Sequence, residues 1–111
     1  MELNLNFNTP KTISVVSLRI MEELATGIFP PQSIEIWGKT NPTSAFKRIQ
    51  MLKVPVPKET RFHELYAIDV KFKPTNFSEM KIIAKPLEKI PQWHGAKDKR
   101  ALLLVDEIFL N

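Results

Sequence analysis

The 111-residue chain contains no cysteine, and this absence removes a whole group of functions. Disulfide bonds, thiolate metal sites and cysteine nucleophiles are all excluded. Glycine is scarce as well, with three residues against nine prolines, which indicates rigid connections between strands. No run of about 18 apolar residues occurs, so the sequence predicts no membrane insertion.

Neither sign of charge dominates any stretch of the chain. The net charge is +4 and the pI is about 9.5, but the basic residues are scattered among acidic ones. The densest basic run, Lys97-Asp98-Lys99-Arg100, contains an acid of its own. Nucleic-acid binding usually shows a basic patch with stacking aromatics. We therefore interpret the excess charge as a solvated surface and expect no nucleic-acid partner; a nucleic-acid binder would gather its cations on one face.

The signatures of catalysis are missing. The two histidines, His63 and His94, do not have the spacing of a metal-binding HExxH helix, and the chain has no Gly-x-Ser-x-Gly elbow or phosphate-binding glycine loop. Glycoside hydrolysis needs two carboxylates across a sugar-sized cleft, and most acids here fall on expected exposed strand positions or in loops. We predict that this domain is not an enzyme.

Alternation of apolar and polar residues predicts an all-β domain. The expected strands are residues 3–8, 12–20, 33–37, 46–54, 65–72, 80–85 and 101–110. Seven short strands separated by turn signals favour a β-sandwich or barrel.

The segment 12–20 changes phase along its length. Ile13 and Val15 share one face, whereas Val16 begins a run on the other, and a β-bulge explains such a slip. Apolar residues as far as Leu24 are also spaced for a helix face, so a helix stays open as the alternative. The β-branched content favours the strand.

Three finer expectations concern local structure. Segment 9–11 is expected to turn, because Pro10 interrupts the alternation. Ile49 and Met51 are expected on one face of their strand. The continuous apolar run 102–105 predicts a strand that is buried on both sides.

The tail holds the most specific pattern in the chain. An aromatic and polar loop, Ile90-Pro91-Gln92-Trp93-His94, leads to the strand Val105-Asp106-Glu107-Ile108. Together with Gly27-Ile28-Phe29-Pro30-Pro31 and Ile34-Glu35-Ile36-Trp37-Gly38, this pattern resembles a known module. The module is the galactose-binding-like accessory domain, of the discoidin or coagulation factor C-terminal type, at the C-terminus of secreted β-N-acetylhexosaminidases of Bacteroidetes, which are chitobiase-like glycoside hydrolases.

This resemblance implies a jelly-roll β-sandwich that occupies residues 1–111 as a single domain, the C-terminal fragment of a larger protein. It implies a non-catalytic, carbohydrate-binding accessory module of a secreted glycosidase, located outside the cell, in the periplasm or on the outer membrane. The partners would be a glycan, either a chitooligosaccharide or a galactoside, and the parent's catalytic domain. The chain starts without a signal peptide, so export would need a signal elsewhere in the parent.

The alternative function is structural, namely a module that packs on a neighbouring domain of a cell-surface protein without binding glycan. The two functions predict different surfaces. A glycan binder should expose Trp93, whereas a structural module should expose a large apolar patch that contains Trp37 or Phe29.

The resemblance also indicates site residues. Trp93 is the expected platform for a sugar ring, with His94, Gln92 and Arg100 as hydrogen-bonding neighbours. The opposing interpretation is that Trp93 folds over the edge of the core and fixes its loop.

Glu107 matches a glutamate that supplies a calcium ligand in relatives, so calcium is the possible cofactor. Asp106 should point to the opposite face of the strand. The alternative is that one of the two acids bonds a loop or a lysine and the other is solvated.

Overall fold

The computed structural model describes residues 1–61 and 64–111, so Phe62 and His63 lie outside the described residues. The described chain is all-β, as predicted, apart from one short 3-10 helix. Its elements are β1 (Glu2–Glu22), η1 (Leu24–Thr26), β2 (Ser33–Lys39), β3 (Lys47–Lys53), β4 (Glu64–Lys85) and β5 (Leu104–Leu110). Five strands replace the seven expected because β1 and β4 each join two predicted strands into one.

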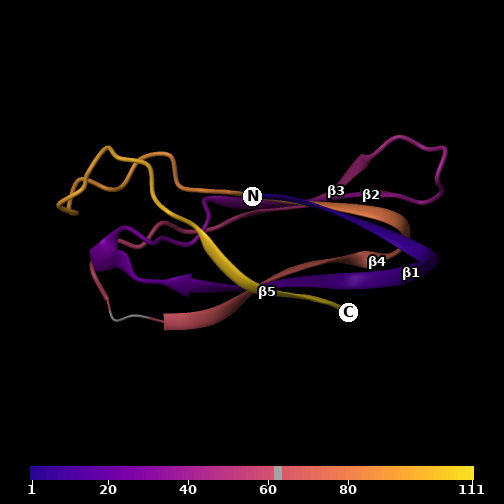
Figure 1. Ribbon diagram of the computed structural model, residues 1–111, viewed down its shortest axis with the longest axis horizontal. Coiled ribbons are helices and arrows are strands. Elements are labelled where there is room, and N and C mark those ends of the chain that lie inside the picture. Colours follow the sequence, from indigo (N-terminus) through magenta and orange to yellow (C-terminus); the bar gives the residue numbers. More distant parts are fainter. Residues whose placement is uncertain (62–63) are drawn as a thin grey trace.

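The strands form one antiparallel sheet in the order β3-β2-β4-β1-β5. The long strands β1 and β4 pair with each other along most of their length. The start of β1, residues 2–6, pairs with residues 79–83 of β4, and residues 15–22 of β1 pair with residues 64–71. Between these two regions both strands bend, and the sheet folds back over itself (Figure 1).

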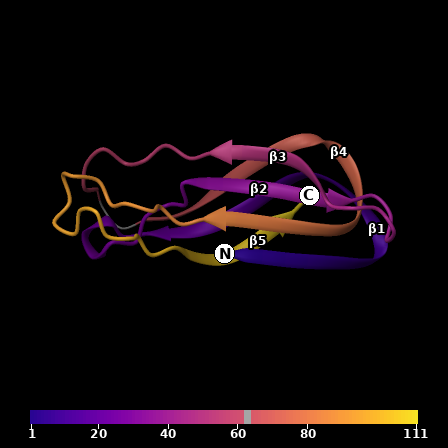
Figure 2. The same ribbon diagram turned by 90° about the horizontal axis from the view of Figure 1, so that it is seen from above.

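The folded sheet has two layers, consistent with a β-sandwich. The first layer contains β3, β2, the second half of β4 and the start of β1; the second layer contains the first half of β4, the end of β1 and β5. The molecule is elongated, 48 × 22 × 20 Å, and the connecting loops gather at its two ends (Figure 2).

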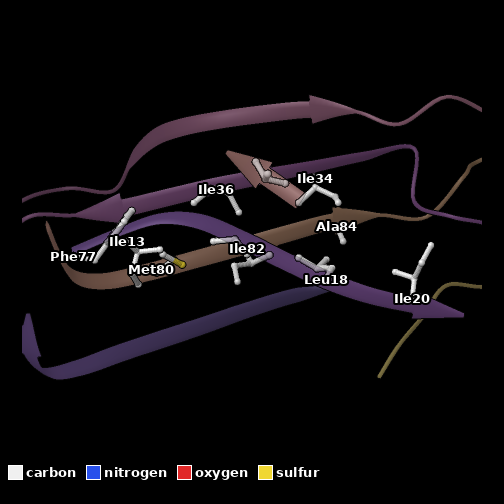
Figure 3. Close-up of a cluster of buried hydrophobic side chains, with 11 residues drawn as sticks. Ile13, Leu18, Ile20, Ile34, Ile36, Phe77, Met80, Ile82 and Ala84 are labelled. Carbon is white, nitrogen blue, oxygen red and sulfur yellow. The ribbon is translucent and has the colours of Figure 1, made fainter. Parts of the chain in front are cut away.

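The main core lies between the layers, where alternate side chains of both layers meet (Figure 3). Leu18 and Ile20 of β1 and Ile36 and Ile82 of the first layer are completely buried. Each such side chain contributes about 1.5–3 kcal/mol through burial. The buried members are Ile13, Val16, Leu18, Ile20, Ile34, Ile36, Val70, Phe77, Met80, Ile82 and Ala84. Alternation therefore predicted the core faces of these strands.

The phase slip in β1 is confirmed as a bulge, because the register with β4 shifts between Ile13 and Val15. The helical alternative for this segment is wrong. The turn expected at 9–11 is also wrong: the chain stays extended there, and the register shifts between Asn6 and Lys11. Pro10 lies in this interval, where no residue of β1 has a partner, so its missing N–H costs no ladder hydrogen bond.

Two further expectations are wrong. In β3 a register shift lies opposite Ile36 and Trp37, so Ile49 packs on the core together with Leu52, whereas Met51 is exposed. The run 102–105 is not buried on both sides. β5 starts at Leu104 and forms the edge of the sheet, and Leu102 is 61% exposed.

Candidate functional site

Three loops gather at the left end of the molecule in Figure 1 and form what we term the loop end, made of residues 23–32, 54–61 and 86–103. Backbone hydrogen bonds join these loops, and one of them runs from the Val54 N–H to the Gln32 carbonyl at 3.0 Å. The Leu102 N–H donates to the Gly27 carbonyl at 2.9 Å, and the Phe29 N–H donates to the Leu102 carbonyl at 3.1 Å. Gly27 has a φ of 85°, which glycine adopts without strain. Binding residues commonly sit on loops that a rigid scaffold positions.

A second apolar cluster supports the loop end from within. Its buried members are Leu24, Phe29, Leu87, Ile90 and Ala101. The loop 86–103 also closes on itself, because the Ile90 N–H donates to the Lys99 carbonyl and the Asp98 N–H donates to the Ile90 carbonyl, at 2.8 and 3.0 Å. The loop is thus stabilised both by the apolar cluster and by its own backbone hydrogen bonds.

Trp93 both packs and faces solvent. Its ring centroid lies 6.2 Å from that of buried Phe29 and 5.6 Å from that of His94, yet the residue is 37% exposed. Each sequence interpretation thus describes part of the geometry. The indole packs against Phe29 and His94, and part of the residue stays exposed to solvent.

The ring of His94 joins two loops. The Ala96 N–H donates to Nδ1 at 2.9 Å, and Nε2 lies 2.5 Å from the carbonyl oxygen of Leu24. A carbonyl only accepts hydrogen bonds, so the Nε2–H tautomer satisfies both contacts. Both ring nitrogens of His94 thus have partners within the protein, and the ring packs beside Trp93.

The other two expected glycan contacts are in different places. The side-chain amide of Gln92 donates to Asp98 Oδ1 at 3.0 Å, and both residues are exposed beside Trp93 in the same loop. Arg100 instead lines a small hollow of about 190 Å³ with Lys85, Pro86 and Glu88. The structure thus places Gln92 in the loop of Trp93 and His94, while Arg100 lines a separate hollow.

Glu107 and its neighbour Asp106 both lie beside the guanidinium of Arg19. Arg19 donates to Asp106 Oδ1 from Nε at 2.9 Å and to Asp106 Oδ2 from Nη2 at 2.7 Å, and Glu107 Oε1 lies 3.7 Å from the same Nη2. A bulge in β5 lets both acids reach one guanidinium, so the expected opposite orientation is wrong. The hydrogen bonds from Arg19 lower the pKa of Asp106 below its ordinary value.

Calcium would need further ligands beside Glu107. The ion takes six to eight oxygen ligands, and Glu107 offers one carboxylate that already faces a guanidinium. Within residues 1–61 and 64–111, no three His, Asp or Glu side chains gather as a metal site.

A buried ionic cluster was not predicted from the sequence. Glu22 is completely buried, and Arg61 donates to both of its carboxylate oxygens at 2.5 Å. The Tyr66 hydroxyl donates to Glu22 Oε1 at 2.8 Å. Burial raises the pKa of Glu22, but the hydrogen bonds from Arg61 and Tyr66 outweigh it and hold the pKa below its ordinary value. Burial and the neighbouring carboxylate raise the pKa of Tyr66 to about 12.

An exposed apolar row crosses the outer face of the second layer. Met21 of β1 pairs with Leu65 of β4 on one side and with Leu104 of β5 on the other, and both leucines are exposed. The structural alternative predicted an exposed apolar patch that contains Trp37 or Phe29. Phe29 is buried and Trp37 is half-buried.

No protein-family model matches this chain, and no curated protein matches it either. Among the residues that the structure describes, no helix is long and apolar enough to cross a membrane.

Proposed function

We propose that this chain is a non-catalytic accessory module that binds glycan at the loop end, with Trp93 as the platform. The observation that carries the proposal is an indole that remains partly exposed while Phe29 and His94 fix it from behind. A rigid aromatic face suits the apolar face of a pyranose, because little side-chain entropy is lost on binding. Gln92 and Asp98 supply polar groups in the same loop.

The sequence resemblance supports the wider setting. The parent would be a secreted β-N-acetylhexosaminidase, the fold a jelly roll of the galactose-binding type, and the ligand a chitooligosaccharide or a galactoside. The environments of the acids support a non-catalytic role. Glu22 is buried against Arg61, and Asp106 and Glu107 face Arg19, so these carboxylates already have cationic partners.

The test is a two-dimensional amide NMR titration with chitotriose and with lactose. One of the sugars should shift the signals of the 90–98 loop saturably, and Trp93→Ala should abolish the shifts while the spectrum stays dispersed. Phe109→Ala is the matched control, because it also removes a partly exposed aromatic ring, here from β5. A Trp93→Ala variant that binds sugar as tightly as the unmodified chain, or a spectrum that neither sugar perturbs, would refute glycan binding at this site.

A second function has its own observation, the apolar row formed by Leu65, Met21 and Leu104. The occupant we propose is the catalytic domain of the parent enzyme. Hydrogen exchange of the full-length enzyme should then show slower exchange around Leu104 than the isolated module does. Equal exchange in the two samples would rule out this docking face without affecting the Trp93 proposal.

A further inference from the structure

A hollow of about 520 Å³ lies beside the segment 52–58, and Trp93 is not among the residues that line it. One wall is the segment 52–58, which continues β3, and the other is formed by residues 66–68 of β4. Its volume falls within the range of small-molecule sites, about 300–1,000 Å³.

The hollow exists because two sheet edges separate there. β3 is the last strand of the first layer, and the first half of β4 is the free edge of the second layer. Nearer the middle of the molecule the Gln50 side chain bridges the two edges by donating to the Lys71 carbonyl at 3.3 Å. Beyond Lys53, Pro55 and Pro57 have no N–H to donate, so the chain does not continue as a paired strand.

The lining combines apolar walls with cations. Among the described residues, it includes three cationic side chains and no carboxylate. The apolar lining residues are Leu52, Val54, Pro55, Val56, Pro57, Ala67 and Ile68. Lys53 and Lys58 are exposed and form no ion pair with any described residue, so their charges are uncompensated.

Arg61 adds a fixed set of hydrogen-bond donors. Glu22 holds its Nε and Nη2 from the buried side. A guanidinium carries five N–H groups, so the two bonds to Glu22 leave three N–H groups, including both on Nη1. With the head group anchored by a buried carboxylate, these donors are positioned before any ligand arrives.

We propose that this hollow binds a small organic anion, namely a carboxylate carried on an apolar body. The carboxylate pairs with Lys53, Lys58 and the free N–H groups of Arg61. The apolar body covers the valine, proline and isoleucine side chains. The site is separate from the Trp93 platform and does not depend on it.

The first test is an NMR titration of the whole chain with phenylacetate, compared with phenylacetamide and acetate. Phenylacetamide keeps the ring without the charge, and acetate keeps the charge without the ring. Phenylacetate should shift the amides of Ala67 and Ile68 saturably and bind about tenfold more tightly than either comparison compound, as expected when charge and burial both contribute. Linear, unsaturable shifts, or equal binding of phenylacetamide, would overturn the proposal.

The second test removes the charges one at a time. Lys53→Gln and Lys58→Gln should each weaken phenylacetate binding about two- to fivefold, the range of a partly solvated ion pair. Both side chains are exposed, so the fold should persist, which the amide spectrum checks. Lys73→Gln makes the same charge change in β4 outside the hollow and should leave affinity unchanged. An equal loss in all three variants would show only a general charge effect and would refute the site.

Discussion

Replacing Glu22 by glutamine should destabilise the fold more than any other neutralisation of a single acid among the described residues. The carboxylate is completely buried and accepts hydrogen bonds from Arg61 and Tyr66. Glutamine keeps the shape but has one acceptor oxygen. Its NH₂ group then faces an N–H group of Arg61, so a donor meets a donor.

The expected cost follows from the two partners' exposure. Breaking a buried ion pair by removing one member costs about 3–5 kcal/mol, because the other charge stays buried and unpaired. Arg61 has a side chain that is 48% exposed and recovers part of its hydration. We therefore expect a loss of about 2–3 kcal/mol, a large share of the roughly 5–15 kcal/mol that stabilises a typical domain.

Urea unfolding followed by far-ultraviolet circular dichroism measures this loss. With a urea m-value of about 1–3 kcal/mol per molar, the midpoint should fall by about 0.7–3 M. Glu35→Gln is the matched control, because Glu35 is also buried but its ion pairs among the described residues are the long ones to exposed Arg48 and Lys85, at 3.6 and 3.8 Å. We expect the control to lose less than about 1 kcal/mol. A Glu22→Gln loss below about 0.5 kcal/mol, or one equal to the control, would refute the reasoning.

Three more predictions follow from single contacts. The pKa of Glu22 is lowered on folding, so the stabilisation by its carboxylate is complete above the ordinary glutamate pKa of about 4.3 and is lost as the pH falls through the lower folded value. In urea unfolding at a series of pH values, Glu22→Gln should therefore lose less stability at acid pH than the unmodified chain does. An equal loss of stability at acid pH in the two proteins would contradict this prediction. Gly38→Ala should cost about 1–3 kcal/mol, because a Cβ there would lie 2.3 Å from the buried ring of Phe77. Gly95→Ala, with nothing within 4 Å of the added Cβ, is its control, and equal melting of the two variants would exclude the clash. Leu104→Ala should cost less than about 1 kcal/mol by thermal unfolding, since Leu104 is 45% exposed on an edge strand; the 2–5 kcal/mol typical of a core leucine would place β5 in the interior.

The periodicity of the sequence predicted which side chains face the core, because alternation is a local property of an extended chain. Val16 and Leu18 of β1 and Ile82 of β4 are buried as their phase predicts. Alternation does not show where a strand ends. The turn predicted at Pro10 is wrong for this reason, because a long strand can bend through an unpaired stretch and continue.

Glu22 shows a second limit of local patterns. It continues the inward phase of Val16, Leu18 and Ile20, so the sequence did contain a signal that its side chain is buried. Its acidic character suggested an exposed position instead. The partners that make burial acceptable, Arg61 and Tyr66, are 39 and 44 residues away and are brought together only by the pairing of β1 with β4.

The fold of the sheet also explains why two candidate sites on one small domain should respond to different perturbations. The Trp93 platform depends on packing between loops, through Phe29 and through the ring of His94, which makes two hydrogen bonds. The hollow beside Lys53 depends on uncompensated charge at a gap between sheet edges. Salt screens exposed charges over a Debye length of about 3 Å at 1 M, and it leaves contact between an indole and a sugar ring largely intact. Raising the salt concentration should therefore weaken anion binding and leave glycan binding largely unchanged. This difference in salt dependence distinguishes the two sites.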